Sequence, residues 1–319
     1  MSTTNLHEAE QFRHEALMYG SVDQFLGGTV PFIRDGVTAG EPVLVVEPAA
    51  KVDMLRKALG RDADAVMFAD MSAVGANPAR IIPAWQEFVT RHEGATRLRG
   101  IGEPIWNERT PDELIECQRH ESLLNVAFGG GRPLWLLCPY DTERLDASVI
   151  DEARRSHEFV TDGTQTQRSD AFRGREASGA PFDVPLPQCG TAVSRIHFGP
   201  NDLASVRNLV AQHAEAAGLG AMRAAELVVA VNEVATNSIQ HGSGRGSLTF
   251  WQDESAAICE ISDRGTFDKS LADRERPQSV MAPRGLWLAN QLCDLVQIRT
   301  LPDGTVVRLH MRRRALAVN

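Results

Sequence analysis

The chain has 319 residues, a formal net charge of -9 at pH 7 and 43% hydrophobic residues, which is enough length and apolar content for two domains with separate cores. The acidic balance argues against nucleic acid or an anionic membrane as the main partner. The N-terminal residues contain no apolar stretch of the kind that a secretory signal needs, and no run of about 18 apolar residues occurs. We therefore expect a cytoplasmic protein without a membrane segment.

The cysteines are odd in number and form no CxxC pair, so neither a disulfide framework nor a zinc site is indicated by their spacing. Small buried or half-buried thiols are expected instead. The five cysteines are Cys117, Cys138, Cys189, Cys259 and Cys293.

In the first half of the chain, short apolar runs alternate with stretches of helical spacing. Strands that are apolar on both faces and separated by helices indicate a parallel sheet covered on both sides. Residues 10–155 are therefore predicted to form a three-layer α/β domain. The predicted strands are 42–48, 66–70, 97–106 and 133–141, and the predicted helices are 49–60, 78–92 and 111–126.

Residues 156–190 are polar and rich in Gly, Pro, Ser and Thr without sustained periodicity, which is typical of a linker. After it, helices and antiparallel-looking strands are segregated, so residues 191–313 are predicted to form an α+β sandwich. Its predicted strands are 193–198, 246–252, 255–262, 295–300 and 304–311, and its predicted helices are 201–217, 222–241 and 284–295.

The helix predicted for 222–241 has two different faces. At about 100° per residue, Glu226, Glu233 and Asn237 fall within roughly 40° of one another, and apolar residues fill the opposite arc. The polar side carries no Lys or Arg to neutralise the carboxylates, so its partner is a cation, a metal or water. A solvated helix face and the wall of a binding site both fit this pattern.

Three further features follow in the chain. Asp263 and Gly265 end a predicted strand, Arg284 and Gly285 open a predicted helix, and Gly304 and Thr305 begin the last strand. Each alone is compatible with an ordinary turn or helix start. A glycine at a helix start also lets backbone N–H groups approach a phosphate.

In this order, and with Glu233 and Asn237 upstream, these motifs resemble the ATP-binding (Bergerat) fold of the GHKL superfamily over about residues 190–312. "NEVATNSIQHG" resembles the N box of anti-sigma-factor serine/threonine kinases of the RsbW type. The resemblance implies ATP and Mg²⁺ as cofactors, a homodimer, and a sigma factor and an anti-anti-sigma antagonist protein as partners.

The resemblance also implies roles for the site residues. Asn237 is the expected Mg²⁺ ligand because Mg²⁺ prefers oxygen donors, and Glu233 is the expected catalytic residue that polarises the attacking hydroxyl. Asp263 is expected to accept the adenine amino group, with Thr305 supporting the base edge. Gly265, Arg284 and Gly285 complete the expected nucleotide-binding set.

The motif after the strand predicted for 255–262 departs from the superfamily pattern. It is DRGTF, so the second glycine of the usual DxGxG is absent and Phe267 closes the run. A nucleotide-gated binding module without kinase activity is therefore an alternative. A sensor histidine kinase is another, although His120-Glu121 is followed by no proline and no dimerising helical hairpin is predicted.

The first domain resembles the MEDS-type sensory domain, distantly similar to the KaiC/RecA-like α/β fold, in "FLGGTVPFIRDGVTAGEPVLVV", "RGIGEPIW" and "ECQRHESLLNVAF". No GxxxxGK[ST] is present, so no P-loop is expected. A small-molecule signal is expected near strand ends or the helix at 111–126, although an exposed pair is the alternative for His120 and Glu121. The residues considered for it are His14, Glu103, Trp106, Cys117, His120 and Glu121.

Overall fold

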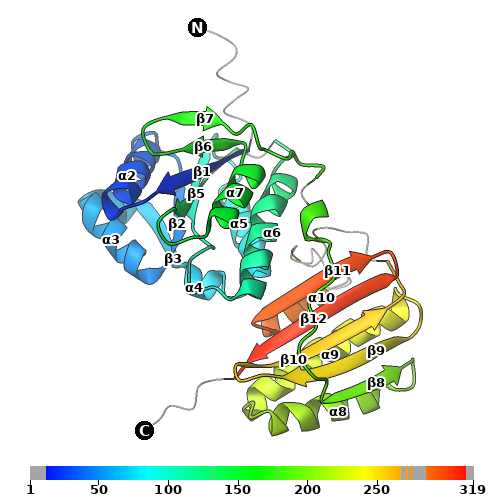
Figure 1. The fold of residues 1–319 in the computed structure, drawn as a ribbon. Helices are drawn as coiled ribbons and strands as arrows, with labels where there is room; N and C mark the ends of the chain where they lie inside the picture. The colour runs from blue at the N-terminus through cyan, green and yellow to red at the C-terminus, as the bar shows by residue number, and fades with distance from the viewer. Residues whose placement is uncertain are drawn as a thin grey trace. The chain divides into compact units, whose positions relative to one another are not determined.

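The structure, a computed structural model, describes residues 12–131, 133–177, 179–266, 271, 274 and 285–313. The chain divides into two compact units, Met1–Ala180 and Pro181–Asn319, and each is described by itself. The predicted combination of a mostly parallel α/β unit followed by an antiparallel α+β unit is confirmed (Figure 1).

The first unit is built on a seven-stranded sheet in the order β3-β2-β4-β5-β1-β6-β7, parallel except for β7. Every residue of β4 is buried, as expected for a strand with helices on both faces. The strands are β1 (Arg13–Tyr19), β2 (Val43–Glu47), β3 (Val66–Asp70), β4 (Leu98–Gly102), β5 (Leu134–Asp141), β6 (Phe159–Thr161) and β7 (Thr166–Arg168).

The helices of this unit begin at local capping signals. Thr110 and Glu113 form a reciprocal capping box at the start of α6, and Ser21 caps α2 by accepting from the Gln24 amide at 3.2 Å. The helices are α2 (Val22–Thr38), α3 (Ala49–Leu59), α4 (Met71–Val74), α5 (Ile81–Arg91), α6 (Pro111–Ala127) and α7 (Ala147–Ser156), with 3₁₀ turns η1 (Gly60–Ala65), η2 (Pro78–Arg80) and η3 (Ala180–Phe182).

Strand β1 and helices α2, α4 and α7 have no counterpart among the predicted elements. The glycines and Pro31 within α2 weaken its helical signal. The structure gives one glycine a packing reason, because a Cβ at Gly28 would lie 2.6 Å from Leu17 Cδ1. Only Gly20 and Ser21 separate β1 from α2, which leaves no room for a P-loop.

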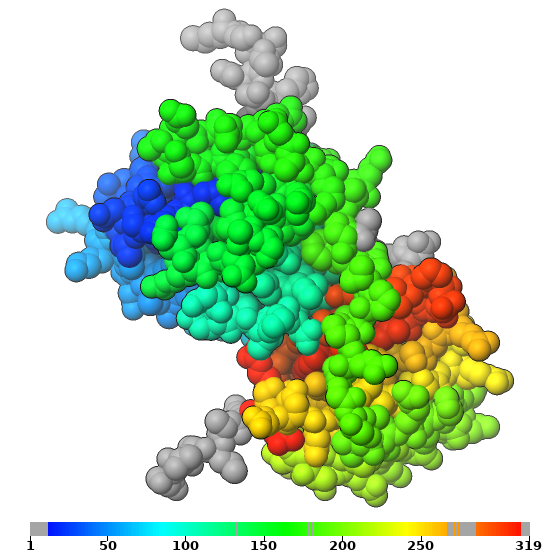
Figure 2. Space-filling model, in the orientation of Figure 1, coloured from blue at the N-terminus to red at the C-terminus, as the bar shows by residue number. Residues whose placement is uncertain are grey.

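Part of the segment 156–190, predicted as a linker, has regular structure. Its first part forms β6 and β7, which add to the sheet beside β1, and its last part belongs to the second unit, where Arg308 donates to the Pro187 carbonyl at 2.7 Å. In Figure 2 the blue atoms of β1 are bordered by green atoms from these later segments. The strands escape prediction because each is only three residues long, and β7 is also polar.

The second unit has a five-stranded antiparallel sheet in the order β11-β12-β10-β9-β8. One face of the sheet forms a single core with apolar side chains of its three helices. The strands are β8 (Ser194–Phe198), β9 (Gly246–Gln252), β10 (Ala256–Asp263), β11 (Leu295–Leu301) and β12 (Gly304–Arg312), and the helices are α8 (Leu203–Ala216), α9 (Ala221–Gln240) and α10 (Gly285–Leu292).

Candidate functional site

The C-terminal half of α9 presents two half-buried polar side chains, Glu233 and Asn237, one helical turn apart. Gly285, the first residue of α10, lies directly against them. A Cβ on Gly285 would be 3.1 Å from Asn237 Nδ2 and 3.2 Å from Glu233 Oε2. The structure therefore brings these three predicted site residues together.

Glu226, on the same helix face, is not part of this group. Arg223 donates to Glu226 Oε2 at 2.7 Å, and its guanidinium also pairs with Asp294 and donates to the Leu292 carbonyl at 3.0 Å. The sequence-based statement that this face has no basic partner is wrong. Arg223 therefore links Glu226 to the junction between α10 and β11.

A second group of predicted residues surrounds the end of β10. Asp263 lies opposite Thr305 in the β10–β12 register. Asp263 Oδ1 accepts from the Gly265 amide at 2.6 Å, and Thr305 Oγ1 donates to the Gly265 carbonyl at 2.8 Å. Both side chains thus hold the Gly265 turn, and Asp263 Oδ2 remains as an acceptor for another group.

Glycines are required around this carboxylate because the backbone is crowded there. Gly304 has a φ of +139°, and a Cβ on it would lie 1.9 Å from the Asp263 carbonyl oxygen. A Cβ on Gly242 would lie 2.6 Å from Asp263 Oδ1. Any side chain at either position would displace the segment that carries Asp263.

The two groups meet at the C-terminal end of α9. The Gly242 amide donates to the Asn237 carbonyl at 3.2 Å, and the same glycine contacts the Asp263 region. The predicted residues Glu233, Asn237, Asp263, Gly265, Gly285 and Thr305 therefore belong to one end of the unit. Arg284 lies outside the described residues.

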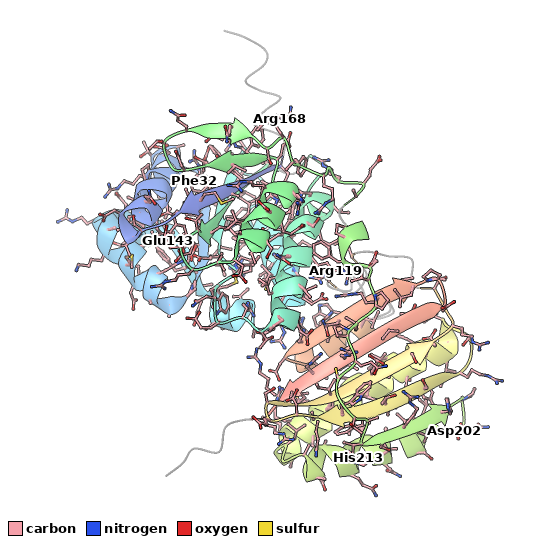
Figure 3. The ribbon with its side chains drawn as sticks, in the orientation of Figure 1. Phe32, Arg119, Glu143, Arg168, Asp202 and His213 are labelled. Carbon is pink, nitrogen blue, oxygen red and sulfur yellow. The ribbon has the colours of Figure 1, made fainter. Side chains whose placement is uncertain are left out.

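A pocket with a cavity volume of about 1020 Å³ lies at the end of the sheet. It is lined by Asp263, Gly304 and Thr305 but not by Glu233 or Asn237. Asp202, labelled in Figure 3, also lines it and accepts from the Gly199 amide at 2.9 Å. The described lining of this pocket therefore includes the second group of predicted residues and not the α9 side chains.

The donor set on α9 fits a hard divalent cation and a phosphate. Glu233 and Asn237 supply carboxylate and amide oxygens, and neither side chain has a hydrogen-bond partner within the described part of the chain. Gly285, the first residue of α10, lies next to these oxygens, and the N–H groups of a helix start can bind a phosphate. These residues are compatible with bound Mg²⁺–nucleotide.

In the first unit, Glu103 follows β4 and forms a network at the carboxyl ends of the strands. Tyr19 donates to Glu103 Oε1 at 2.9 Å, and Lys51 pairs with the other oxygen. Burial, together with the charge of Glu103, raises the pKa of the neighbouring Glu47 carboxyl well above its usual value, while Lys51 opposes the shift. Glu47 therefore keeps its proton to a higher pH than an exposed glutamate does.

Two other residues considered for this unit have structural contacts. The Arg109 guanidinium lies 3.8 Å from the centre of the Trp106 ring, and Cys117 Sγ donates to the Pro104 carbonyl at 3.3 Å. Both contacts hold the segment between β4 and α6.

The expectation that His120 and Glu121 form an exposed pair is wrong, since each side chain is only 1% exposed. Glu121 Oε2 instead lies 3.2 Å from His14 Nε2, which joins two residues considered for the sensory domain. Burial is the main cause, and the nearby His157 the second, that lowers the pKa of His14 to about 4. Its ring is neutral at pH 7.

Comparisons with known proteins match both units. Residues 13–158 match the family model for MEDS, the methanogen/methylotroph DcmR sensory domain, and residues 196–311 match the model for the histidine kinase-like ATPase domain. No curated protein matches the chain. Among the described residues, no helix combines the length and apolar character needed to cross a lipid bilayer.

One solved structure with a matching region contains the RsbU and RsbW domains of Rv1364c from Mycobacterium tuberculosis. It shares 19% identity with this chain, with a TM-score of 0.30. The match covers 40% of this chain and 35% of that chain.

Proposed function

We propose that this chain, which joins a MEDS sensory domain to a histidine kinase-like ATPase domain, is an ATP-dependent regulator with serine/threonine kinase activity. The observation that supports it best is the placement of Glu233 and Asn237 against Gly285 at one end of α9. A nucleotide with its metal needs oxygen ligands and backbone donors at the same place, and this end of the unit offers both.

In this proposal, the C-terminal domain binds ATP across the two groups of residues. Asp263 accepts a hydrogen bond from the adenine amino group. Thr305 keeps the Gly265 turn in place through its hydrogen bond to the Gly265 carbonyl. Asn237 holds Mg²⁺, which neutralises phosphate charge when it is bound. Gly265, Arg284 and Gly285 contact the phosphate groups in this proposal.

Glu233 is the proposed general base. It accepts the proton of a Ser or Thr hydroxyl on a protein substrate while that oxygen forms a bond to the γ-phosphorus. The bond between the γ-phosphorus and the β–γ bridging oxygen breaks, and ADP leaves. Asn237, one turn further along α9, is placed to orient the phosphate relative to this carboxylate.

The proposed partners are a sigma factor and an antagonist protein that compete for the C-terminal domain of a homodimer. Phosphorylation adds a charge of about -2 to the antagonist, which weakens its binding beside a site that contains two carboxylates. The released regulator then binds its other partner. We further propose that a signal bound by the N-terminal domain controls this exchange.

The alternative of a sensor kinase that phosphorylates its own histidine is disfavoured by burial. A phosphoacceptor histidine must reach the nucleotide, whereas His120 is 1% exposed within the first unit. A nucleotide-gated binding module without phosphate transfer differs from our proposal only in the role of Glu233. Measuring binding and transfer on the same variant distinguishes these two functions.

The test is transfer of labelled γ-phosphate to an antagonist protein encoded beside this chain. Glu233→Gln is expected to keep nucleotide affinity and to lower the transfer rate by about 10²- to 10⁴-fold, because general-base assistance is lost. Glu226→Gln on the same helix is the matched control and should transfer normally, since Glu226 pairs with Arg223. Undiminished transfer by Glu233→Gln would remove Glu233 from catalysis.

A further inference from the structure

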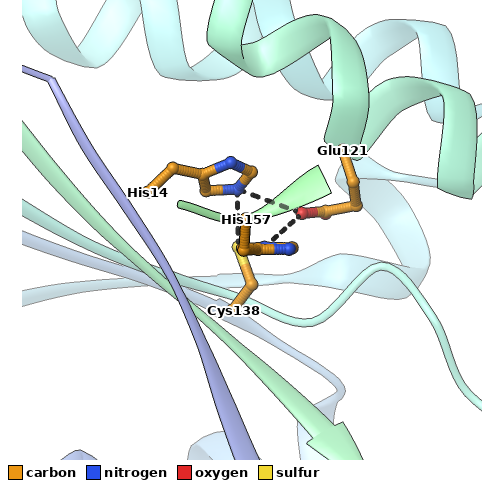
Figure 4. A group of neighbouring side chains, drawn as sticks. All are labelled: His14, Glu121, Cys138 and His157. Atoms are coloured by element: carbon orange, nitrogen blue, oxygen red, sulfur yellow. Dashed lines mark hydrogen bonds and ion pairs between the residues drawn. The ribbon is translucent and has the colours of Figure 1, made fainter. Parts of the chain in front are cut away.

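Four side chains that can bind a metal meet inside the first unit, away from the nucleotide site. They are His14 on β1, Glu121 on α6, Cys138 on β5 and His157 immediately after α7 (Figure 4). None is more than 2% exposed. His14 and Cys138 share one face of the sheet, because Cys138 pairs with Ala16 and side chains alternate along a strand.

The donor atoms of these residues are close enough to share one ion. His14 Nε2 lies 3.2 Å from Glu121 Oε2 and 3.4 Å from Cys138 Sγ, and His157 Nε2 lies 3.2 Å from the same carboxylate oxygen. All four donors lie within 4.8 Å of one another. A tetrahedral Zn²⁺ site with ordinary bond lengths separates its donors by about 3.3–3.8 Å.

The hydrogen bonds of Asn125 show which nitrogen of His14 carries the proton. The Asn125 amide group donates to the Ser156 carbonyl at 2.7 Å and to the Ser122 carbonyl at 3.2 Å, which turns its oxygen toward His14 Nδ1 at 3.2 Å. An amide oxygen only accepts, so Nδ1 must be the donor. In a neutral ring, Nε2 then presents a lone pair to Glu121 and Cys138.

The same reasoning applies to His157. Its Nδ1 lies 2.8 Å from the Ala153 carbonyl, which also only accepts, so Nδ1 carries the proton. Nε2 has no hydrogen bond of acceptable geometry to any described residue, although it faces Glu121 and is fully buried. Metal-bound histidines commonly donate their other ring nitrogen to a carbonyl in this manner.

Two lone pairs that point at one buried carboxylate need a positive charge between them. Protonating both rings would bury two cations against a single carboxylate, which is costly away from water. One divalent ion satisfies both nitrogens, and the carboxylate and a Cys138 thiolate balance its charge. The thiol proton is released to solvent when the metal binds.

We infer that the first unit binds one divalent transition-metal ion of the Zn²⁺ class through His14 Nε2, Glu121, Cys138 Sγ and His157 Nε2. Nitrogen and thiolate donors select such ions over Mg²⁺ or Ca²⁺. Four protein ligands in a buried position make a closed site, typical of structural metals. The ion joins β1, α6, β5 and the end of α7, so its binding is coupled to the stability of this unit.

The test uses the full chain, purified without a histidine tag and stripped of metal, with Co²⁺ as a spectroscopic probe. We expect one equivalent of Co²⁺ to produce a thiolate-to-cobalt charge-transfer band and the intense visible bands of tetrahedral cobalt. Zn²⁺ should displace it and should raise the Tm of the first unit. Cys138→Ser should lose the charge-transfer band, and His157→Gln should bind metal at least about tenfold more weakly.

Cys117→Ser is the matched control, because Cys117 is an equally buried cysteine in the same unit whose thiol donates to a backbone carbonyl. It should keep the band and the rise in Tm. Circular dichroism of each stripped variant checks that it is folded. Folded wild-type protein without a charge-transfer band, or a band that survives Cys138→Ser and disappears in Cys117→Ser, would overturn the assignment. This outcome is independent of ATP binding and phosphate transfer.

Discussion

Asp263 is positioned by its own turn, which makes its role testable by a minimal substitution. Oδ1 accepts from the Gly265 amide, and an asparagine can keep that bond through its oxygen while it places an NH₂ group where Oδ2 was. Asp263→Asn should therefore fold normally and weaken ATP binding about 10- to 100-fold, because two donors then face each other.

Calorimetry with ATP and with purine riboside triphosphate, which lacks the adenine amino group, measures this effect. The loss for ATP should exceed the loss for the analogue. Equal losses would show that Asp263 supports the turn and does not recognise the base.

Glu47 provides a second test at the scale of a single residue. Its folded-state pKa is raised, so the folded state holds a proton that the unfolded state releases above about pH 4.3. As pH rises from about 4.3 toward the folded-state pKa of Glu47, this group should lower the free energy of unfolding by about 1.4 kcal/mol per pH unit. Glu47→Gln, which stays neutral, should lack this loss.

Hydrogen exchange of the β4 and β5 amides, converted to a free energy of opening from pH 5 to pH 8, measures this contribution within the first unit. Glu93→Gln, at an exposed position, is the control and should behave like the wild type. A pH dependence that is the same in Glu47→Gln and wild type would show that Glu47 is ionised in the folded protein.

Single residues also show why the sequence predicts the site incompletely. Glu233 and Asn237 are recognisable because they share one face of a strongly periodic helix. Glu226 shares that face, yet its partner Arg223 also pairs with Asp294, 71 positions further along the chain. The sequence around Cys138 and His157 does not predict their cluster, since its four members come from four separate segments.

At the scale of elements, the apolar runs predict strands β2, β3 and β5 closely, and the stretches of helical spacing predict helices α3 and α6. Helix α2 is missed because its glycines and Pro31 weaken the helical signal, and the packing of Gly28 against Leu17 of β1 is not visible in a local pattern. Strands β6 and β7 are missed because β6 depends on pairing with β1, far away in the sequence, and β7 pairs with β6.

The hairpin of β6 and β7 belongs to the first unit, which extends to Ala180. Thr166 donates to Glu15 Oε1 at 2.8 Å, and β6 pairs with β1 over three positions. A fragment of residues 1–180 should fold alone, whereas a fragment of residues 1–155 exposes the edge of β1 and lacks His157.

Circular dichroism and thermal unfolding of the two fragments check this prediction. The longer fragment should show a cooperative transition, and the shorter one should be less stable or aggregate. Equal stability of the two fragments would show that the hairpin is dispensable for the fold.

At the scale of the whole molecule, two compact units with different sheet types carry different chemistry. The first unit has only two residues between β1 and α2 and contains the buried His14–Glu121–Cys138–His157 cluster. The second places half-buried oxygen donors at the end of α9, where a nucleotide is expected. Specific ATP binding should therefore belong to the second unit alone.

The most direct test of the central claim is calorimetry of ATP binding to the full chain with and without Mg²⁺. We predict Mg²⁺-dependent binding that Asn237→Ala weakens about tenfold or more, equivalent to ~1.4 kcal/mol, because an oxygen ligand is lost. Asn232→Ala on the same helix is the control, since Asn232 accepts from Arg207 on α8 at 2.9 Å, and it should bind normally. Equal Mg²⁺-dependent affinity in Asn237→Ala and wild type would contradict the proposed nucleotide site.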